Sequence, residues 1–279
     1  MKSNYIKLLS LISGLLLLFS CRPPSCSWDA YLREGNRFFQ RGDYRRAQKF
    51  YQQGLERFPE AYRIHTALGD LYLRTRKFDL AEKSYLKAIT INFGDHLAHF
   101  GLGDVWLEQE NYAKAEKEFR LVLELKPDFE RAYTGLGDIL VDLQRYEEAQ
   151  KYFFQALELN PRPAYEDTYL GLAELYLGSG DWPRAEKYGR LAIKANHLDA
   201  DSYLALAQAL DAQKKYSEAG FYYRKALRLA PGHKDALLSW AGMLKATGDY
   251  KRAVQQYQAC LKKYPDCRQA LLELESVNK

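Results

Sequence analysis

Few residues in this chain have the types and spacing that chemistry requires. His96 and His99 are three residues apart, so on a helix they would share one face and could bind a metal together. Zinc needs three or four ligands, and no cysteine or acid with ligand spacing accompanies them. The stretch from Gly101 to Asp104, Gly-Leu-Gly-Asp, is half of a phosphate-binding loop, but no strand precedes it. Neither Gly-x-Ser-x-Gly nor His-Glu-x-x-His occurs. We therefore expect no metal, no cofactor, no catalytic residues and no enzymatic activity.

The N-terminal segment reads as a leader that is removed. Its apolar run from Leu8 to Phe19 spans twelve residues and follows Lys2 and Lys7, with no acid. A helix that crosses a bilayer needs about 20 apolar residues. A basic start, a short apolar run and then small residues are instead typical of a secretory signal peptide. We expect residues 1–20 to be cleaved off.

The end of this run carries a more specific signal. Leu18-Phe19-Ser20-Cys21 resembles the lipobox of bacterial lipoproteins, in which the cysteine thiol receives a diacylglycerol and the cysteine becomes the first mature residue. Phe19 departs from that pattern, because its slot usually holds a smaller residue, and an ordinary signal peptide is the alternative. The resemblance implies that Cys21 is acylated, that residues 21–27 are a lipidated cysteine and a short tether, and that the protein is held at the cell envelope. It favours the outer membrane over the inner one, with the chain facing the periplasm or the surface.

Composition agrees with a water-facing body behind this leader. The chain is 47% apolar and 28% charged, and its net charge is +5. Removal of residues 1–20 takes away two lysines and no acid, which leaves +3. Binding of nucleic acid needs a concentrated basic patch. We expect no nucleic-acid partner and infer no small-molecule substrate.

Three cysteines remain after Cys21, namely Cys26, Cys260 and Cys267, so at least one stays unpaired within the chain. Cys260 stands where other parts of the chain carry a packing alanine, which favours a small buried side chain. A bridge from Cys260 to Cys267 requires Cα atoms within about 7 Å. The sequence leaves every disulfide open.

The dominant pattern is a repeat of 34 residues, in which an alanine recurs seven times once a two-residue insertion near Arg162 is allowed. These alanines are Ala47, Ala81, Ala115, Ala149, Ala185, Ala219 and Ala253. Glycine or alanine stands twelve residues before each, and an aromatic follows four residues after all but the fifth, where Gly189 interrupts the series. Small residues let two helices approach to about 8 Å, and large ones fill the space around them. Each unit is thus expected to be an antiparallel helix pair, with the fifth unit the least stable.

At this point the residues resemble the tetratricopeptide repeat family. The fit is best in the third unit, with Leu102-Gly103-x-x-Trp106, then Ala115-x-x-x-Phe119, then Pro127. The resemblance implies an all-α fold, an α-solenoid or superhelix of about seven helix pairs. The units span 28–61, 62–95, 96–129, 130–163, 166–199, 200–233 and 234–267, with residues 268–279 as a capping helix and tail. We expect the first two helices near 28–40 and 44–57, and the cap helix at 268–277.

The resemblance also implies where a partner binds. In this family the first helix of each pair faces a concave groove, and such walls bind peptides or helices. Carrying the inward slots over gives an acidic groove with an apolar floor, formed by Asp70, Phe100, Asp104, Leu107, Glu108, Asp138, Val141, Asp142, Leu170 and Glu174. The alternative is that the acids form only a solvated helix face.

Function is then expected to reside in a surface. The favoured hypothesis is a membrane-anchored scaffold of the bacterial envelope that binds a basic and apolar segment of another envelope protein, for assembly of an envelope or secretion complex. The second is a regulator that recruits an envelope enzyme such as a peptidase or a cell-wall synthase. An enzyme in its own right is the least favoured.

The lipidation hypothesis makes the first testable prediction. When cells that produce the chain grow with a fatty-acid analogue, the wild type should incorporate label and Cys21→Ala should not, because the thiol and the new N-terminus are the acylated groups. Gel detection of the label after delipidation with solvent is the measurement. Equal labelling of the two proteins contradicts the hypothesis.

Overall fold

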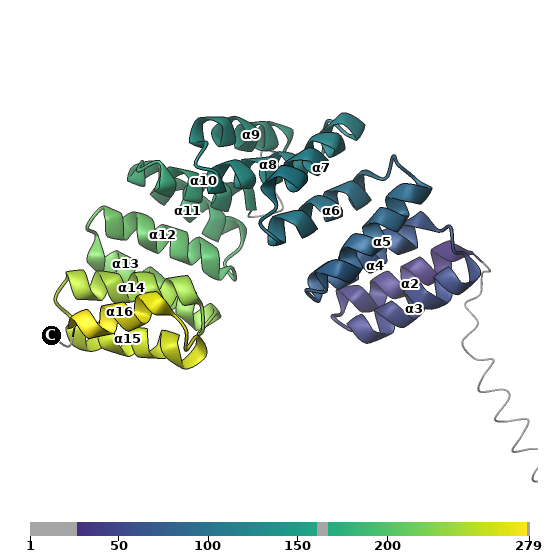
Figure 1. The fold of residues 1–279 in the computed structure, drawn as a ribbon. Coiled ribbons are helices and arrows are strands. Elements are labelled where there is room, and N and C mark those ends of the chain that lie inside the picture. The colour runs from purple at the N-terminus through teal and green to yellow at the C-terminus, as the bar shows by residue number, and fades with distance from the viewer. Residues whose placement is uncertain (1–26, 161–166, 278–279) are drawn as a thin grey trace, which may run out of the picture. The chain divides into compact units, whose positions relative to one another are not determined.

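The structure is a computed structural model that describes residues 27–160 and 167–277 (Figure 1). These residues contain fifteen α-helices and no strand. The predicted signal peptide, Cys21 and Cys26 lie outside them. Within the described ranges, no helix has both the length and the apolar character needed to cross a membrane.

The helices form seven successive pairs followed by one last helix. The first three pairs are α2 (Trp28–Gln40) with α3 (Tyr44–Arg57), α4 (Tyr62–Arg74) with α5 (Phe78–Ile91), and α6 (His96–Glu108) with α7 (Tyr112–Leu125). The next four are α8 (Glu130–Asp142) with α9 (Tyr146–Leu159), α10 (Asp167–Gly178) with α11 (Trp182–Ala195), α12 (Ala200–Ala212) with α13 (Tyr216–Leu229), and α14 (Lys234–Ala246) with α15 (Tyr250–Lys263). The last helix is α16 (Arg268–Val277). The predicted all-α fold of stacked helix pairs with a final capping helix is confirmed.

The chain divides into two compact units between Leu125 and Lys126. The N-terminal unit holds α2 to α7, and the C-terminal unit holds α8 to α16. Each unit is a stack of helix pairs with its own buried core.

The helices of a pair are held together by an aromatic ring that lies on a glycine. A Cβ atom placed on Gly69 would stand 2.5 Å from the ring of Tyr85, and one on Gly103 would stand 2.5 Å from the ring of Phe119. Both rings are fully buried. Because a hydrogen leaves room where a methyl group would clash, the ring packs directly on the backbone of the first helix. This contact explains the glycine and aromatic positions of the repeat.

The turn inside each pair is the same in all seven pairs. Gly42, Gly180 and Gly248 have φ between 75° and 82° there. The other four pairs place a side chain in this left-handed conformation, with φ of 56° to 62°, at Arg76, Glu110, Gln144 and Lys214. A residue other than glycine is disfavoured in this region by about 1 kcal/mol or more. The close packing of the helix pair therefore holds the turn even where no glycine marks it in the sequence.

The turn between successive pairs is held by a side chain of the next helix. A ring nitrogen or hydroxyl in the first turn of that helix bonds to the carbonyl oxygen six residues earlier, in four cases: His65 to Pro59, His99 to Phe93, Tyr133 to Pro127 and Tyr203 to His197, at 2.8 to 3.2 Å. Two of these carbonyls belong to proline and two do not. The hydrogen bond thus keeps the turn where the helix-ending proline is absent.

His99 is one of these turn-holding residues. Its Nε2 atom lies 3.0 Å from the Phe93 carbonyl oxygen, and its Nδ1 atom lies 2.7 Å from a carboxylate oxygen of Glu118. The ring is 3% exposed. Both nitrogens are therefore engaged inside the protein, which assigns His99 to packing.

Gly189 is a site of close packing. A Cβ atom there would lie 3.2 Å from the Cα atom of Leu206, on the neighbouring helix α12. As a result α11 packs against α12 more extensively than any other second helix packs against the helix that follows it. The ring of Tyr188, one residue earlier, stacks on Tyr176 at 5.5 Å between centroids. Gly189 thus allows close contact with the backbone of α12 where the other units place a ring, and the lower stability expected of the fifth unit stays a prediction.

Gly189→Ala should therefore lower the free energy of unfolding by about 1 kcal/mol or more, since the methyl group meets backbone atoms that cannot move aside. Gly220→Ala is the matched control, because its Cβ would meet only the ends of two flexible side chains, Met243 at 3.6 Å and Arg224 at 4.0 Å. That control should raise stability by about 0.5 to 1 kcal/mol, from helix propensity alone. Denaturant unfolding followed by circular dichroism measures both. An equal gain in the two variants contradicts close packing at Gly189.

Candidate functional site

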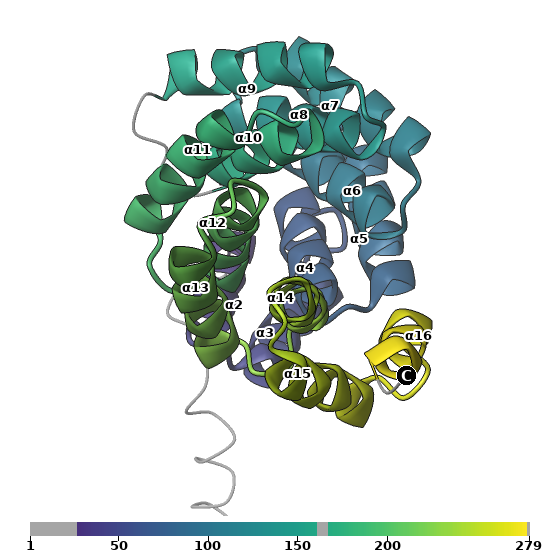
Figure 2. The same ribbon diagram turned by 90° about the vertical axis from the view of Figure 1, so that its left-hand side faces the viewer.

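Within each unit, the first helices form one continuous layer. In the N-terminal unit α2 packs on α4 and α4 on α6, and in the C-terminal unit α8 packs on α10, α10 on α12 and α12 on α14. No two second helices of the described chain contact each other to a comparable extent. Figure 2 shows this order for α8, α10 and α12. The first helices are therefore more closely spaced than the second ones. We call the surface of the first helices that faces away from the second helices the inner face of each unit.

The ten predicted site residues divide evenly between the two inner faces. Those of the N-terminal unit are Asp70, Phe100, Asp104, Leu107 and Glu108, and those of the C-terminal unit are Asp138, Val141, Asp142, Leu170 and Glu174. The structure brings together each set of five on adjacent first helices. Each set is a candidate surface of its own.

Two acids of the N-terminal unit already have partners. Tyr85 donates its hydroxyl hydrogen to Oδ1 of Asp70 at 2.7 Å, although Asp70 is exposed. Glu108 forms an ion pair with Arg76 at 3.2 Å, and both side chains are exposed. Asp70 thus anchors a core tyrosine, and Glu108 carries a screened surface pair that a partner's cation can replace at little cost.

The apolar predicted residues of this unit differ in exposure. Phe100 is 6% exposed and its ring lies 5.2 Å from that of Phe119, centroid to centroid. Leu107 and Asp104 are half-buried. Phe100 is therefore buried below the inner face, and Leu107 is the predicted apolar residue of this unit that remains partly exposed.

The C-terminal unit holds the more concentrated acidic group. Burial is the largest of the causes that raise the pKa of Glu174 to about 7, and the charges of Asp201, Asp142 and Asp199 contribute in that order. Glu174 is nevertheless exposed to solvent. We attribute the desolvation to the neighbouring helices α8 and α12, which flank α10, and not to a covering segment. A carboxylate that is accessible but poorly solvated and surrounded by like charge attracts a cation strongly.

Apolar surface accompanies these acids. Val141 and Leu170 are both half-buried, and Asp138 is half-buried beside Gly171, where a Cβ atom would come within 2.8 Å of Oδ1 of Asp138. Glycine at this position lets the carboxylate lie close to the helix backbone. The inner face of the C-terminal unit thus combines partly exposed aliphatic groups with a cluster of acids.

The sequence interpretation missed the role of tyrosine hydroxyls on the inner faces. Tyr51 donates to Asn36 at 2.6 Å, and Tyr223 donates to Asp211 at 3.3 Å, as Tyr85 does to Asp70. Phe119 and Phe153 fill the same slot in the third and fourth units and carry no hydroxyl. The presence of tyrosine in some repeats and phenylalanine in others at this slot was the sequence signal for the hydroxyl's role.

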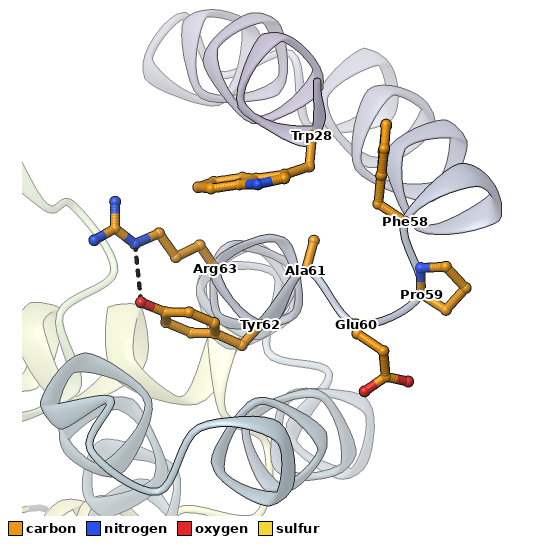
Figure 3. A pocket seen from close by; sticks show the side chains of 7 residues that line it. All are labelled: Trp28, Phe58, Pro59, Glu60, Ala61, Tyr62 and Arg63. Carbon is orange, nitrogen blue, oxygen red and sulfur yellow. Dashed lines mark hydrogen bonds between the residues drawn. The ribbon is translucent and has the colours of Figure 1, made fainter. Parts of the chain in front are cut away.

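An apolar pocket in the N-terminal unit was also missed. It has a volume of about 360 Å³ and lies where the start of α2 meets the turn from α3 to α4 (Figure 3). Its lining consists of Trp28, Phe58, Pro59, Glu60, Ala61, Tyr62 and Arg63. Arg63 donates from Nε to the hydroxyl oxygen of Tyr62 at 3.2 Å and lies 5.9 Å from the centre of the Trp28 ring. This size is at the lower end for small-molecule pockets, and it suits a single apolar side chain.

Comparison with known proteins defines the class. Sequence profiles described as Tetratricopeptide repeat match residues 32–96, 96–129, 128–196, 170–234 and 210–275. These matches cover the chain continuously from 32 to 275. The chain belongs to the tetratricopeptide repeat family. This confirms the resemblance, and the fold of this family is consistent with binding of protein partners.

Solved structures agree with this assignment. A tetratricopeptide repeat protein from Parabacteroides merdae ATCC 43184 shares 19% identity over 91% of this chain and 100% of its own, with a TM-score of 0.70. A chain of the APC/C hetero-tetramer Cut9-Hcn1 shares 17% identity over 99% of this chain and 53% of its own, with a TM-score of 0.83. PilW, described as a widely conserved type IV pilus biogenesis factor, shares 23% identity over 78% of this chain and 98% of its own, with a TM-score of 0.67.

At these identities the structural likeness establishes the fold alone. A search of curated proteins by sequence finds no match. The structural neighbours serve different assemblies, so the particular role of this chain must come from its own surfaces.

The raised pKa of Glu174 gives a prediction with a definite sign. Between about pH 4.5 and 7 the folded chain holds a proton on Glu174 that the unfolded chain has lost, so this residue lowers stability progressively as the pH rises. Glu174→Gln should therefore gain stability relative to wild type from pH 4.5 to 7.5. In Asp201→Asn, an NMR titration of Glu174 should show a lower midpoint than in wild type, because the largest of the charge contributions to the raised pKa is removed. If the difference in unfolding free energy between Glu174→Gln and wild type is the same at pH 4.5 and pH 7.5, the raised pKa is contradicted.

Proposed function

We propose that this chain is a lipid-anchored adaptor of the bacterial cell envelope that binds a segment of another envelope protein on its inner face. The segment carries Lys or Arg with apolar side chains between them. The observation that carries the proposal is the acidic cluster around Glu174, which is accessible to a partner and lies beside the aliphatic surface of Val141 and Leu170.

Charge and apolar contact have separate roles in this binding. Opposite charges accelerate the encounter and select a basic segment, while burial of apolar area contributes about 25 cal/mol per Å², less the cost of ordering. A Lys or Arg beside Glu174 favours its ionised form. Binding therefore releases a proton, and affinity should rise as the pH increases through about 7.

The envelope location is supported by the lipobox-like segment that ends at Cys21 and by the likeness to PilW, a pilus biogenesis factor. The tether from Cys21 to Trp28 is six residues long and reaches about 20 Å when extended. The first repeat would therefore remain close to the lipid surface. Assembly of a surface structure fits this placement.

The test uses the tagged full chain in detergent-solubilised envelopes. A carbodiimide joins carboxylates directly to lysine amines that contact them, so the partner should be linked through its lysines to the inner face of the C-terminal unit. Asp142→Lys with Glu174→Lys should abolish most of the linked product. Glu147→Lys with Glu158→Lys is the matched control, because it makes the same change in net charge at exposed positions of the second helix α9 and should leave the product intact.

Salt separates charge-driven binding from non-specific recovery. Exposed charges are screened beyond about 8 Å at physiological ionic strength. Recovery of the partner should fall as salt rises, with retention of the fold checked by circular dichroism. If the inner-face variant and the α9 control behave alike, the acids form only a solvated helix face and the proposal is wrong.

A further inference from the structure

The seventh repeat contains two cysteines at positions where no other repeat has one. The slot of Cys260 is filled elsewhere by Gly54, Ala88, Val122, Ala156, Ala192 and Ala226. The slot of Cys267 is filled elsewhere by Ala61, Asp95, Phe129, Pro163, Asp199 and His233. Both substitutions occur together, in the repeat that carries the capping helix.

The fold places the two cysteines side by side. Cys260 lies in the last turn of α15, and its carbonyl oxygen accepts from the backbone N–H of Tyr264 at 2.8 Å. The carbonyl oxygen of Tyr264 accepts in turn from the N–H of Cys267 at 3.0 Å, and the carbonyl oxygen of Cys267 accepts from Leu271 of α16 at 3.1 Å. These bonds fold the chain back so that both side chains enter the same core cluster.

The thiols are neighbours inside this core. Both are free, at 0% and 7% exposure. Burial raises the pKa of the Cys260 thiol, and the neighbouring thiol of Cys267 raises it as well. A disulfide has an S–S length of about 2 Å, so its formation here requires the two neighbouring thiols to approach to that distance.

The capping helix is the element that a bond here would secure. Among the described helices, α15 is the one on which it packs extensively. Leu271 and Leu272 are 46% and 56% exposed. Beyond the core, its described polar contacts join Lys245 to Glu273 and Ser276, each at 2.7 Å. Loss of this helix would expose the end of the core.

We propose that Cys260 and Cys267 form a disulfide that fastens the capping helix to the last repeat. The oxidant is a disulfide, either of a small molecule or of another protein. The thiolate of Cys267, the more exposed of the two, attacks one sulfur of this disulfide and releases one thiol. Cys260 then loses its proton and attacks Sγ of Cys267, which releases the second thiol and leaves the Cys260–Cys267 bond.

Peptide mapping detects the Cys260–Cys267 disulfide. The purified full chain is reduced, incubated with oxidised glutathione, blocked with N-ethylmaleimide and cut with trypsin. Cleavage after Arg252, Lys262, Lys263 and Arg268 separates the two cysteines. Mass spectrometry should find peptide 253–262 joined to peptide 264–268, and the joined mass should disappear after reduction.

The effect on the capping helix is measured by hydrogen exchange. Closure of this short loop should slow exchange of the α16 amides roughly 10- to 100-fold in the oxidised chain relative to the reduced one. Cys260→Ala is the matched control, because alanine fills this slot in four other repeats. It should fold, show no joined peptide and exchange equally under both conditions. Cys267→Ser provides a second control.

The opposing outcomes are distinct. Glutathione attached singly to Cys267, a bond from either cysteine to Cys26 or to a second chain, or two thiols that stay open would each overturn the proposal. A joined peptide with unchanged exchange of α16 would overturn the role in fastening the helix. The inner-face acids take no part in this test, so its result is independent of the proposed function.

Discussion

The structure depends on the packing of one aromatic ring on the backbone of the partner helix. In four repeats that ring lies over a glycine of the first helix, as Tyr85 lies over Gly69 and Phe119 over Gly103. A methyl group at these glycines would collide with the ring, so the distance between the helices and the identity of the residue are coupled. Once the pair is fixed at this distance, one residue of the turn between its helices has a left-handed backbone conformation. Residues other than glycine, such as Arg76, adopt this conformation in four of the turns.

The same ring connects the core to the candidate site. In three repeats it is a tyrosine whose hydroxyl bonds to a residue of a first helix, as Tyr85 does to Asp70. Where it is phenylalanine, as in Phe153, the inner-face acid cannot receive this bond. Core composition therefore decides which acids are held by the scaffold. It also explains why some acids of an inner face are hydrogen-bonded to a tyrosine hydroxyl while others do not receive this bond.

Departures from the repeat pattern show local adaptation. Gly189 replaces the ring and allows α11 to approach the backbone of α12, so a close contact to the next pair is added while α11 keeps its packing on α10. His99 and Tyr203 bond to the carbonyls of Phe93 and His197, which keeps the turn where proline is absent. In a stack where each pair contacts mainly its neighbours, such exchanges are tolerated because each one restores the contact that it removes.

The sequence by itself determined the helix pairs, their boundaries at Trp28–Gln40 and Tyr44–Arg57, the family and the final helix, because the 34-residue spacing of small and aromatic residues admits little else. It also named the acids of the inner faces. It could not show that Gly189 is a tight contact or that a pocket forms at Trp28, since both depend on residues from separate helices. Only the tertiary structure decided which acids meet around Glu174, because desolvation and like charge arise from side chains on neighbouring helices that the linear spacing does not bring together.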